Sequence, residues 1–310
     1  MLHRVTALAL NTYRESVRAR ILLGLAGVAF CVALFSLVVG AFTVRNAPRV
    51  VSDLGAASIS IFGIAVAIVI GSTSLHRELE QKTIFPILAR PVRRGEYLVG
   101  KFLGTLLTIA VFIMADAGVV LLLTAGLGGR PPQQVAGVAV AAVAGLAIAM
   151  WRWPAARTFG PIPWSVLVLA AGVALSGVAP DERRVLLGNC LLAFFEVAVV
   201  SAMGLLFSSF STPFLSALLT VMMTIVGRSA NTLPKLSAKE FGAVIHGMAV
   251  FLSKIVPNLF VFVPERTLFT GEVAGVPIAP YLGMAAWSAL AWSVGLLAVA
   301  AFVFRRRDFL

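Results

Sequence analysis

The sequence predicts an all-α polytopic membrane protein, and three observations support this fold class. Hydrophobic residues make up 60% of the 310 residues, and the mean hydropathy is +0.99. Only 12% of the residues are charged, whereas about a quarter are charged in a soluble domain. The apolar residues also fall in long runs, many of them near the roughly 20 residues that a helix needs to cross a bilayer.

The basic residues lie beside these runs. In a soluble protein the net charge of +12 would suggest a nucleic-acid partner, but here Lys and Arg cluster at the ends of apolar runs, where they set topology and contact anionic lipid. We therefore expect membrane lipid, and no nucleic acid, as a partner. Cys31 and Cys190 lie inside apolar runs without a metal-ligand spacing, which favours packing over a disulfide or a metal site. No cofactor is predicted.

Residues 1–20 predict a helix that lies at the membrane surface. Apolar side chains recur at helical spacing from Val5 to Tyr13, while Arg14 and Arg18 lie on other faces. The alternative is a signal peptide. The apolar run that follows is too long for one and has no A-x-A cleavage site, so we interpret it as a retained first span.

Eight apolar runs are predicted to cross the membrane. They cover residues 21–42, 54–75, 102–127, 135–151, 164–178, 186–207, 214–226 and 281–304. The fourth and fifth are near the short limit for a span and are joined by a turn that contains Arg152 and Arg157. We interpret residues 135–178 as an added helix pair on a six-helix core. A re-entrant or interfacial hairpin is the alternative, and it would leave six spans.

The distribution of Lys and Arg predicts that both termini are cytoplasmic. With eight spans, 15 of the 25 basic residues fall on the side of the termini, and half of the other ten fall in one long loop, where charges count little. This loop, residues 227–280, contains an S-x-x-E capping box at Ser237 and Glu240, and Pro257 ends the helix that follows. The apolar positions of this predicted outer amphipathic helix are Phe241, Val244, Ile245, Met248, Leu252 and Ile255.

Two carboxylates lie near the middle of apolar runs, where an ionised group costs about 2.5 kcal/mol or more. Asp116 and Glu196 are therefore expected to face protein or water. They could tie helices together through hydrogen bonds, or they could line a transport path. No catalytic or paired-carboxylate motif accompanies them, so we expect a chain that is not itself an enzyme.

Residues 95–101, GEYLVGK, nearly match a phosphate-binding loop. Phe102 occupies the position of the hydroxyl that binds Mg²⁺, and no strand precedes the segment, so nucleotide binding is rejected. Gly100 and Gly104 form a G-x-x-x-G pattern, which permits close approach of a second helix, although glycine is common enough in membrane helices that chance explains the pattern equally well.

The longest charged interval between apolar runs is residues 76–101. Ile84, Phe85 and Leu88 could form an apolar ridge on a short helix that contacts a cytoplasmic partner, while Glu80 stays in water. The alternative is a solvated loop whose arginines only set topology.

The motifs of this interval resemble the first cytoplasmic loop of ABC-2 type transporter permeases. Its pattern is E-x-E-x-x-T, then LARPV-R, then GK, and it is similar to the branch that includes the nitrous-oxide-reductase maturation permeases. Further pieces follow in family order along the chain. They are NTYRESVRARIL near the N-terminus, SDLG at 52–55, LFSSFSTP at 206–213, VPNL at 256–259 and FRRRDF at 304–309.

The resemblance implies a coupling helix at about residues 80–88 that docks onto a separate ABC ATPase subunit. The coupling residues would be Glu78, Glu80, Thr83, Ile84, Phe85, Leu88, Pro91 and Arg94. It also implies two ATPases and a second permease copy or homologue in the working unit. The added pair at 135–178 departs from the six-span pattern of the family.

These inferences predict a permease subunit of an ABC-2 type (type II) exporter in a bacterial cytoplasmic (inner) membrane, with ATP hydrolysis in the partner. Two alternatives stay open. The assembly could transmit motion to an extracytoplasmic partner, or the chain could be a secondary transporter driven by protons through Asp116 and Glu196.

Overall fold

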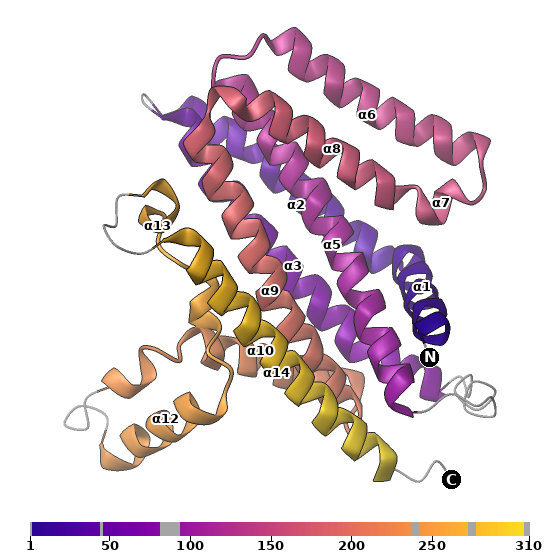
Figure 1. The fold of residues 1–310 in the computed structure, drawn as a ribbon, viewed down its shortest axis with the longest axis vertical. Helices are drawn as coiled ribbons and strands as arrows, with labels where there is room; N and C mark the ends of the chain where they lie inside the picture. Colours follow the sequence, from indigo (N-terminus) through magenta and orange to yellow (C-terminus); the bar gives the residue numbers. More distant parts are fainter. Residues whose placement is uncertain (1, 44–45, 81–93, 237–241, 272–276, 307–310) are drawn as a thin grey trace.

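The structure is a computed structural model that describes residues 2–43, 46–80, 94–236, 242–271 and 277–306. These residues form helices and connecting turns, with no strand among them, as the sequence predicts. Figure 1 shows a bundle of long helices, with residues 132–175 along one side and residues 243–255 on the other. The helices are α1 (Leu2–Arg18), α2 (Arg20–Ala41), α3 (Ala47–Glu80), α5 (Arg94–Leu127), α6 (Pro132–Arg152), α7 (Ala156–Phe159), α8 (Pro161–Leu175), α9 (Pro180–Ser208), α10 (Pro213–Arg228), α12 (Ala243–Ile255), α13 (Thr267–Thr270) and α14 (Ile278–Arg306), with short 3-10 helices η1 (Ser176–Val178), η2 (Leu233–Lys235) and η3 (Leu259–Phe262).

Seven of the described helices are long and apolar enough to cross a membrane, namely α2, α3, α5, α6, α8 with η1, α9 and α14. The bundle has two ends, which we call the α1 end and the α13 end (Figure 1). At the α1 end the start of α5 meets the end of α14, where Tyr97 stacks on Phe304. At the α13 end the first turns of α3 and α9 meet the segment that leads into α13.

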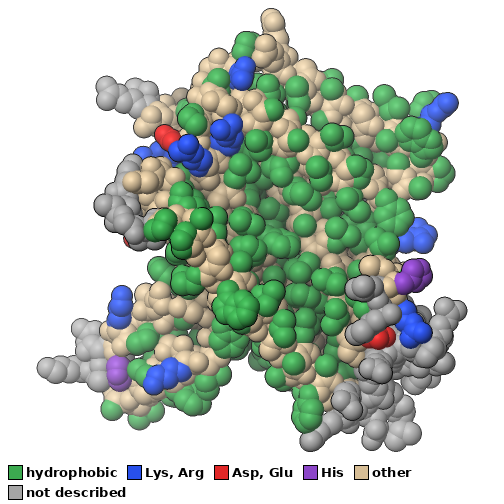
Figure 2. All heavy atoms as spheres, viewed as in Figure 1, with side chains coloured by type: hydrophobic (Ala, Val, Ile, Leu, Met, Phe, Trp, Pro, Cys, Tyr) green, Lys and Arg blue, Asp and Glu red, His purple; other side chains and the backbone are tan. Residues whose placement is uncertain are grey.

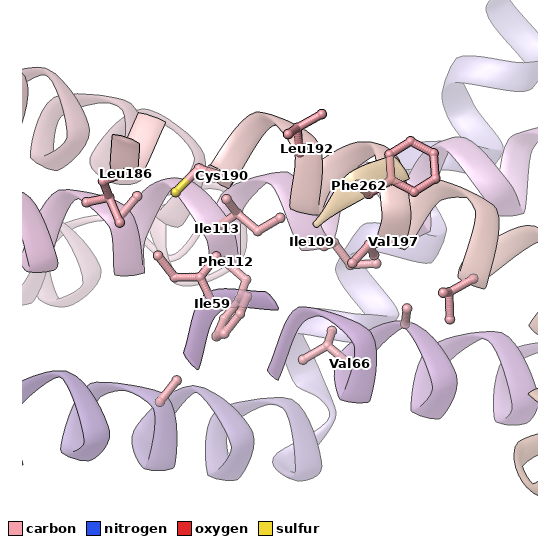
Figure 3. Close-up of a cluster of buried hydrophobic side chains, with 14 of the residues drawn as sticks. Ile59, Val66, Ile109, Phe112, Ile113, Leu186, Cys190, Leu192, Val197 and Phe262 are labelled. Carbon is pink, nitrogen blue, oxygen red and sulfur yellow. The ribbon is translucent and has the colours of Figure 1, made fainter. Parts of the chain in front are cut away.

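The core lies between α3, α5 and α9. Its side chains include Ile59 from α3, Phe112 from α5 and Val197 from α9, which are all buried (Figure 3). Close approach is possible because Gly71 of α3 lies against the backbone of Gly204 of α9, where an added Cβ would come within 3.2 Å of the Gly204 Cα. Small residues at such crossings are typical of helix packing in membranes.

Helix α1 packs on α5 through the G-x-x-x-G pattern. A Cβ on Gly104 would lie 2.4 Å from the backbone oxygen of Ala9, and one on Gly100 would lie 2.6 Å from the Cβ of Leu8. A helix is therefore present where the sequence predicts one, and its buried face, which includes Tyr13, packs on protein; its place at the membrane surface stays a prediction. The ring of Tyr13 stacks on Phe159 of α7, so α1 also contacts the turn between α6 and α8.

The added pair forms two helices that run alongside the bundle. Helix α8 is anchored on α5, because the backbones of Gly118 and Gly172 pack so closely that neither leaves room for a Cβ. Helix α6, in contrast, has no buried residue along its 21 positions and lies at the periphery in Figure 1. The sequence pattern predicts both helices, and the structure adds their unequal attachment to the bundle.

The seventh predicted span, 214–226, is helix α10, which is shorter than the seven described helices that are long enough to cross a membrane. Helix α10 has 16 residues and a length of about 24 Å, against about 30 Å of hydrocarbon. It ends at Arg228, whose side chain reaches Glu196 near the middle of α9. Among the described residues, η2, α12 and η3 follow before α13.

Helix α12 stands beside the bundle, well away from α13 (Figure 1). Of its predicted apolar positions, Val244, Ile245, Met248 and Ile255 are exposed and Leu252 is half-buried. The buried residue of the helix is Ala249, which was not among the predicted positions. The helix ends at Ile255, just before the proline that is predicted to stop it. The predicted capping box and Phe241 lie outside the described residues.

Candidate functional site

Two stripes of polar side chains face each other between α3 and α9. On α3 they are Asp53 and Ser60, and on α9 they are Glu182, Asn189 and Glu196. Consecutive members are seven residues apart, which is close to two helical turns and places them on one face of each helix. The stripes extend from the α13 end to the middle of the bundle, and we call the space that they line the polar groove.

The deep end of the polar groove is an ion pair that joins three helices. Arg228 donates from Nε to Glu196 Oε1 at 2.7 Å and from a terminal nitrogen to Oε2 at 2.9 Å. Its terminal nitrogen also donates to Ser60 Oγ at 2.6 Å. The Glu196 side chain is 1% exposed and that of Arg228 is 34% exposed. Such a paired guanidinium and carboxylate form a strong, directional contact, which ties α10 to α9 and α3.

The outer end of the polar groove is closed by a second arginine. Arg266, directly before α13, donates to Asp53 of α3 and to Glu182 of α9. Partial burial lowers the pKa of the Arg266 guanidinium, but the hydrogen bonds and charges of the two carboxylates outweigh this and raise it above its ordinary value. Arg49, one turn before Asp53, lies 3.8 Å from the same carboxylate. The α13 end of α3 and α9 is thus held by charge.

A pocket of about 310 Å³ lies between the two arginines. Its polar lining comes from Asp53, Ser60 and Asn189 of the stripes and from Arg228 and Arg266, while Glu182 and Glu196 lie behind the two arginines as their partners. Its apolar lining includes Ala193 and Phe262. Towards the α1 end, α3 and α9 close onto each other at Gly71 and Gly204. The groove is therefore bounded by the Arg266 ion pairs at the α13 end and by the Gly71–Gly204 contact towards the α1 end, which is a geometry suited to holding a polar group part of the way across the bundle.

The two intramembrane carboxylates that the sequence singles out have different surroundings. Glu196 is the acceptor of the deep ion pair. Asp116 on α5 is 1% exposed, and neither of its carboxyl oxygens has a hydrogen-bond partner among the described residues. Asp116 does not line the polar groove.

The predicted coupling residues fall largely outside the structure that can be described. Glu78, Glu80 and Arg94 belong to the ends of α3 and α5, but the positions of their side chains are not described. The others, Thr83, Ile84, Phe85, Leu88 and Pro91, lie outside the described residues altogether. Their role in docking stays a prediction.

Sequence reasoning missed most of the polar groove. It identified Glu196 but gave no role to Ser60, Glu182, Arg228 or Arg266. The seven-residue spacing from Glu182 through Asn189 to Glu196 was a usable signal, because a polar stripe on an otherwise apolar helix indicates a protein-facing or water-facing side. The partners on α3 and α10 are distant in sequence and carry no local signal.

Apolar helices around a charged groove define the class of this protein as a multi-pass membrane protein of the transporter type. Residues 6–309 match the family described as ABC-2 family transporter protein, and the chain belongs to this family. It is therefore a membrane component of an ABC transporter, a component that is typically non-catalytic. No curated protein matches the chain.

Replacing Asp116 by Asn is expected to leave stability within about 1 kcal/mol of the wild type, because Asn has nearly the same size and the carboxyl has no hydrogen-bond partner to lose among the described residues. Transport should also persist. Thermal unfolding and ATP-dependent transport measure the two effects, with Glu196→Gln as the control that does weaken an ion pair. A folded Asp116→Asn protein without transport would instead favour a proton-coupled mechanism.

Proposed function

We propose that this chain is the permease of an ABC exporter and converts ATP hydrolysis by a separate ATPase subunit into a change in the polar groove. The observation that carries the proposal is the continuity of α3. This helix is unbroken over 34 residues, holds Asp53 and Ser60 in the groove, and ends at Glu80, where the predicted coupling helix begins. A displacement of the coupling helix would therefore move one wall of the groove directly.

The other side of the coupling stretch is equally continuous. Helix α5 begins at Arg94 and runs for 34 residues through the core. The proposed docking segment is thus held between the two longest helices of the described chain. A displacement of this segment would therefore be transmitted through α3 to the groove and through α5 to the core. Of the connections in the chain, the one between α3 and α5 is best placed to transmit motion from an ATPase.

We assign the α1 end to the cytoplasm, because the basic residues gather on that side. The polar groove then lies in the half of the bundle nearer the outer face of a bacterial cytoplasmic membrane, with the Arg266 ion pairs at its outer end. In the resting arrangement Arg228 and Arg266 are paired with carboxylates. Motion of α3 relative to α9 would loosen Ser60 and Asp53 from these arginines and make polar groups available to a substrate.

The expected assembly contains two ATPases and a second permease copy or homologue. The similarity to the nitrous-oxide-reductase maturation branch remains a prediction from the motifs, since the family match is to ABC-2 transporters as a whole. Transfer of motion to an extracytoplasmic partner is a second candidate. The surface for such a partner would be the exposed apolar side chains of α12, which was predicted to lie outside and has Ala249 as its one buried residue in the described chain.

The coupling proposal is tested by replacing Ile84 and Phe85 together with Asp. We expect the ATPase no longer to co-purify and ATP-dependent transport to fall at least about 100-fold, because two charges would replace the apolar ridge at a docking surface, where a few apolar anchors supply most of the affinity. Pull-down of the ATPase and a vesicle transport assay measure this result.

The matched control is Gln81→Asp, which adds a negative charge to the same stretch but leaves the apolar ridge intact. It should bind the ATPase as the wild type does. If the double variant retains ATPase binding and ATP-dependent transport, the proposed docking role is wrong.

A further inference from the structure

A deep apolar crevice lies between α6 and α8. Its volume is about 590 Å³, within the range of roughly 300–1,000 Å³ for pockets that hold small molecules. On α6 its wall is formed by small residues one turn apart, Ala141, Gly145 and Ala149, and Gly160 and Ala171 lie on the opposite side. Because α6 has no buried residue, protein does not fill this space. In a membrane, an apolar crevice of this kind must be filled by hydrocarbon.

The spacing of the two crevice walls is fixed by one contact. Trp164 of α8 lines the crevice and donates from its indole Nε1 to the backbone oxygen of Ala142 in α6, at 3.0 Å. From this contact the crevice extends to Ala156 and Gly160, beside the turn at α7, and in the other direction to Val138 and Ala171. The space therefore leads from the α1 end of the pair past its middle.

The turn at the α1 end of the crevice is basic and aromatic. Arg152 and Arg157 are both exposed, and Arg157 donates to the backbone oxygen of Met150 at 3.1 Å. Trp151 and Trp153 are 81% and 61% exposed, as is typical of aromatic side chains at a membrane interface. Residues 130–180 contain no Asp or Glu, so no acidic side chain of this segment neutralises the arginines.

Helix α1 adds to this positive charge. Its Tyr13 stacks on Phe159 of α7, which brings α1 beside the turn, and the neighbouring Arg14 and Arg18 are exposed. In the space-filling view, basic side chains lie at the right-hand edge of the molecule, where α7 joins the pair in Figure 1, while hydrophobic side chains cover much of the rest of this face (Figure 2).

We infer that the crevice between α6 and α8 is a binding site for one anionic phospholipid from the leaflet at the α1 end. An acyl chain fills the apolar space past Trp164, and the phosphate lies at Arg152 and Arg157. Hydrocarbon accounts for the apolar walls, and the net positive charge at the α7 end, which Glu15 of α1 offsets only in part, selects an anionic headgroup. The lipid completes the packing of α6, which protein contacts alone leave at the periphery.

The test uses the full chain in detergent micelles with either phosphatidylglycerol or phosphatidylcholine, and counts bound lipid by native mass spectrometry. Phosphatidylglycerol should bind the wild type more tightly. The pair Arg152→Gln and Arg157→Gln should weaken its binding about 30-fold, as expected for two basic residues near a headgroup, and should abolish the preference. Both arginines are exposed, so this variant is expected to fold.

A second variant tests the apolar part of the site. Ala141→Leu with Ala149→Leu fills the crevice and should remove bound lipid of either kind. Ala144→Leu with Ala147→Leu is the matched control, because these exposed positions on the same helix do not line the crevice. Equal binding of the two lipids by the wild type, or undiminished binding by the folded crevice-filled variant, would overturn the inference.

Discussion

Glu196→Ala is expected to be among the most damaging single changes in the described part of the bundle. It would remove the acceptor of two hydrogen bonds from Arg228 and leave a largely unpaired guanidinium inside the bundle, beside the middle of α9. Breaking a buried ion pair in this way costs about 3 kcal/mol or more, and the partial exposure of Arg228 places the expected loss at the lower end. Thermal unfolding in detergent measures the loss, and transport should fall with it.

A double-mutant cycle separates the ion pair from a general packing effect. Adding Arg228→Ala to Glu196→Ala should restore part of the lost stability, because the unpaired charge is then removed. Asn189→Ala is the matched control on the same face of α9, since Asn189 lines the groove without taking part in the ion pair. Strictly additive losses in the cycle would show that the contact between the two side chains contributes little.

Gly104→Ala should have an effect of similar size for a different reason. The new methyl group would lie 2.4 Å from the backbone oxygen of Ala9, and a backbone atom cannot turn aside as a side chain can. Overpacking of this kind costs roughly 1–3 kcal/mol, and we expect a loss of about 3 kcal/mol together with displacement of α1 from α5. Thermal unfolding and protease sensitivity of the N-terminal helix measure the two effects.

The control for this change is Gly126→Ala in the same helix. There the new methyl group meets its nearest neighbour, a Val135 side chain, at 3.9 Å, which is an ordinary contact. Alanine also favours a helix over glycine by about 1 kcal/mol, so this variant should be as stable as the wild type or more so. If both variants behaved alike, close packing of α1 on α5 would not explain the glycine at position 104.

The helices of this protein were predictable because each is encoded locally. Apolar runs long enough for a membrane predict the spanning helices, and helical periodicity predicts α1 and α12. The shortfall of α10 was less evident, since a run of apolar residues does not reveal whether a helix crosses completely or ends at an internal partner. Arg228 was counted as an outer charge, whereas its side chain lies on Glu196 in the middle of α9.

The polar groove was harder to predict than the helices because its members meet only after folding. Ser60 and Arg228 are separated by 168 positions in the sequence, and Asp53 and Arg266 by 213. The spacing of polar residues along α9 indicates a polar face, but it does not identify the helices that cover that face. Sequence alone therefore predicted the carboxylate Glu196 and left its partner unnamed.

The close approach of α3 and α9 at Gly71 and Gly204 also has a consequence for how α3 would move. If Gly71 is the fulcrum at which α3 pivots on α9, the arm to Glu80 is about 14 Å long and the arm to Asp53 is about 27 Å long. A shift of about 1 Å at the short arm would then become about 2 Å at the long arm, enough to separate Asp53 from Arg266. The position of the glycine pair along α3 would thus set the ratio between the displacement at Asp53 and the displacement at Glu80, which is about two.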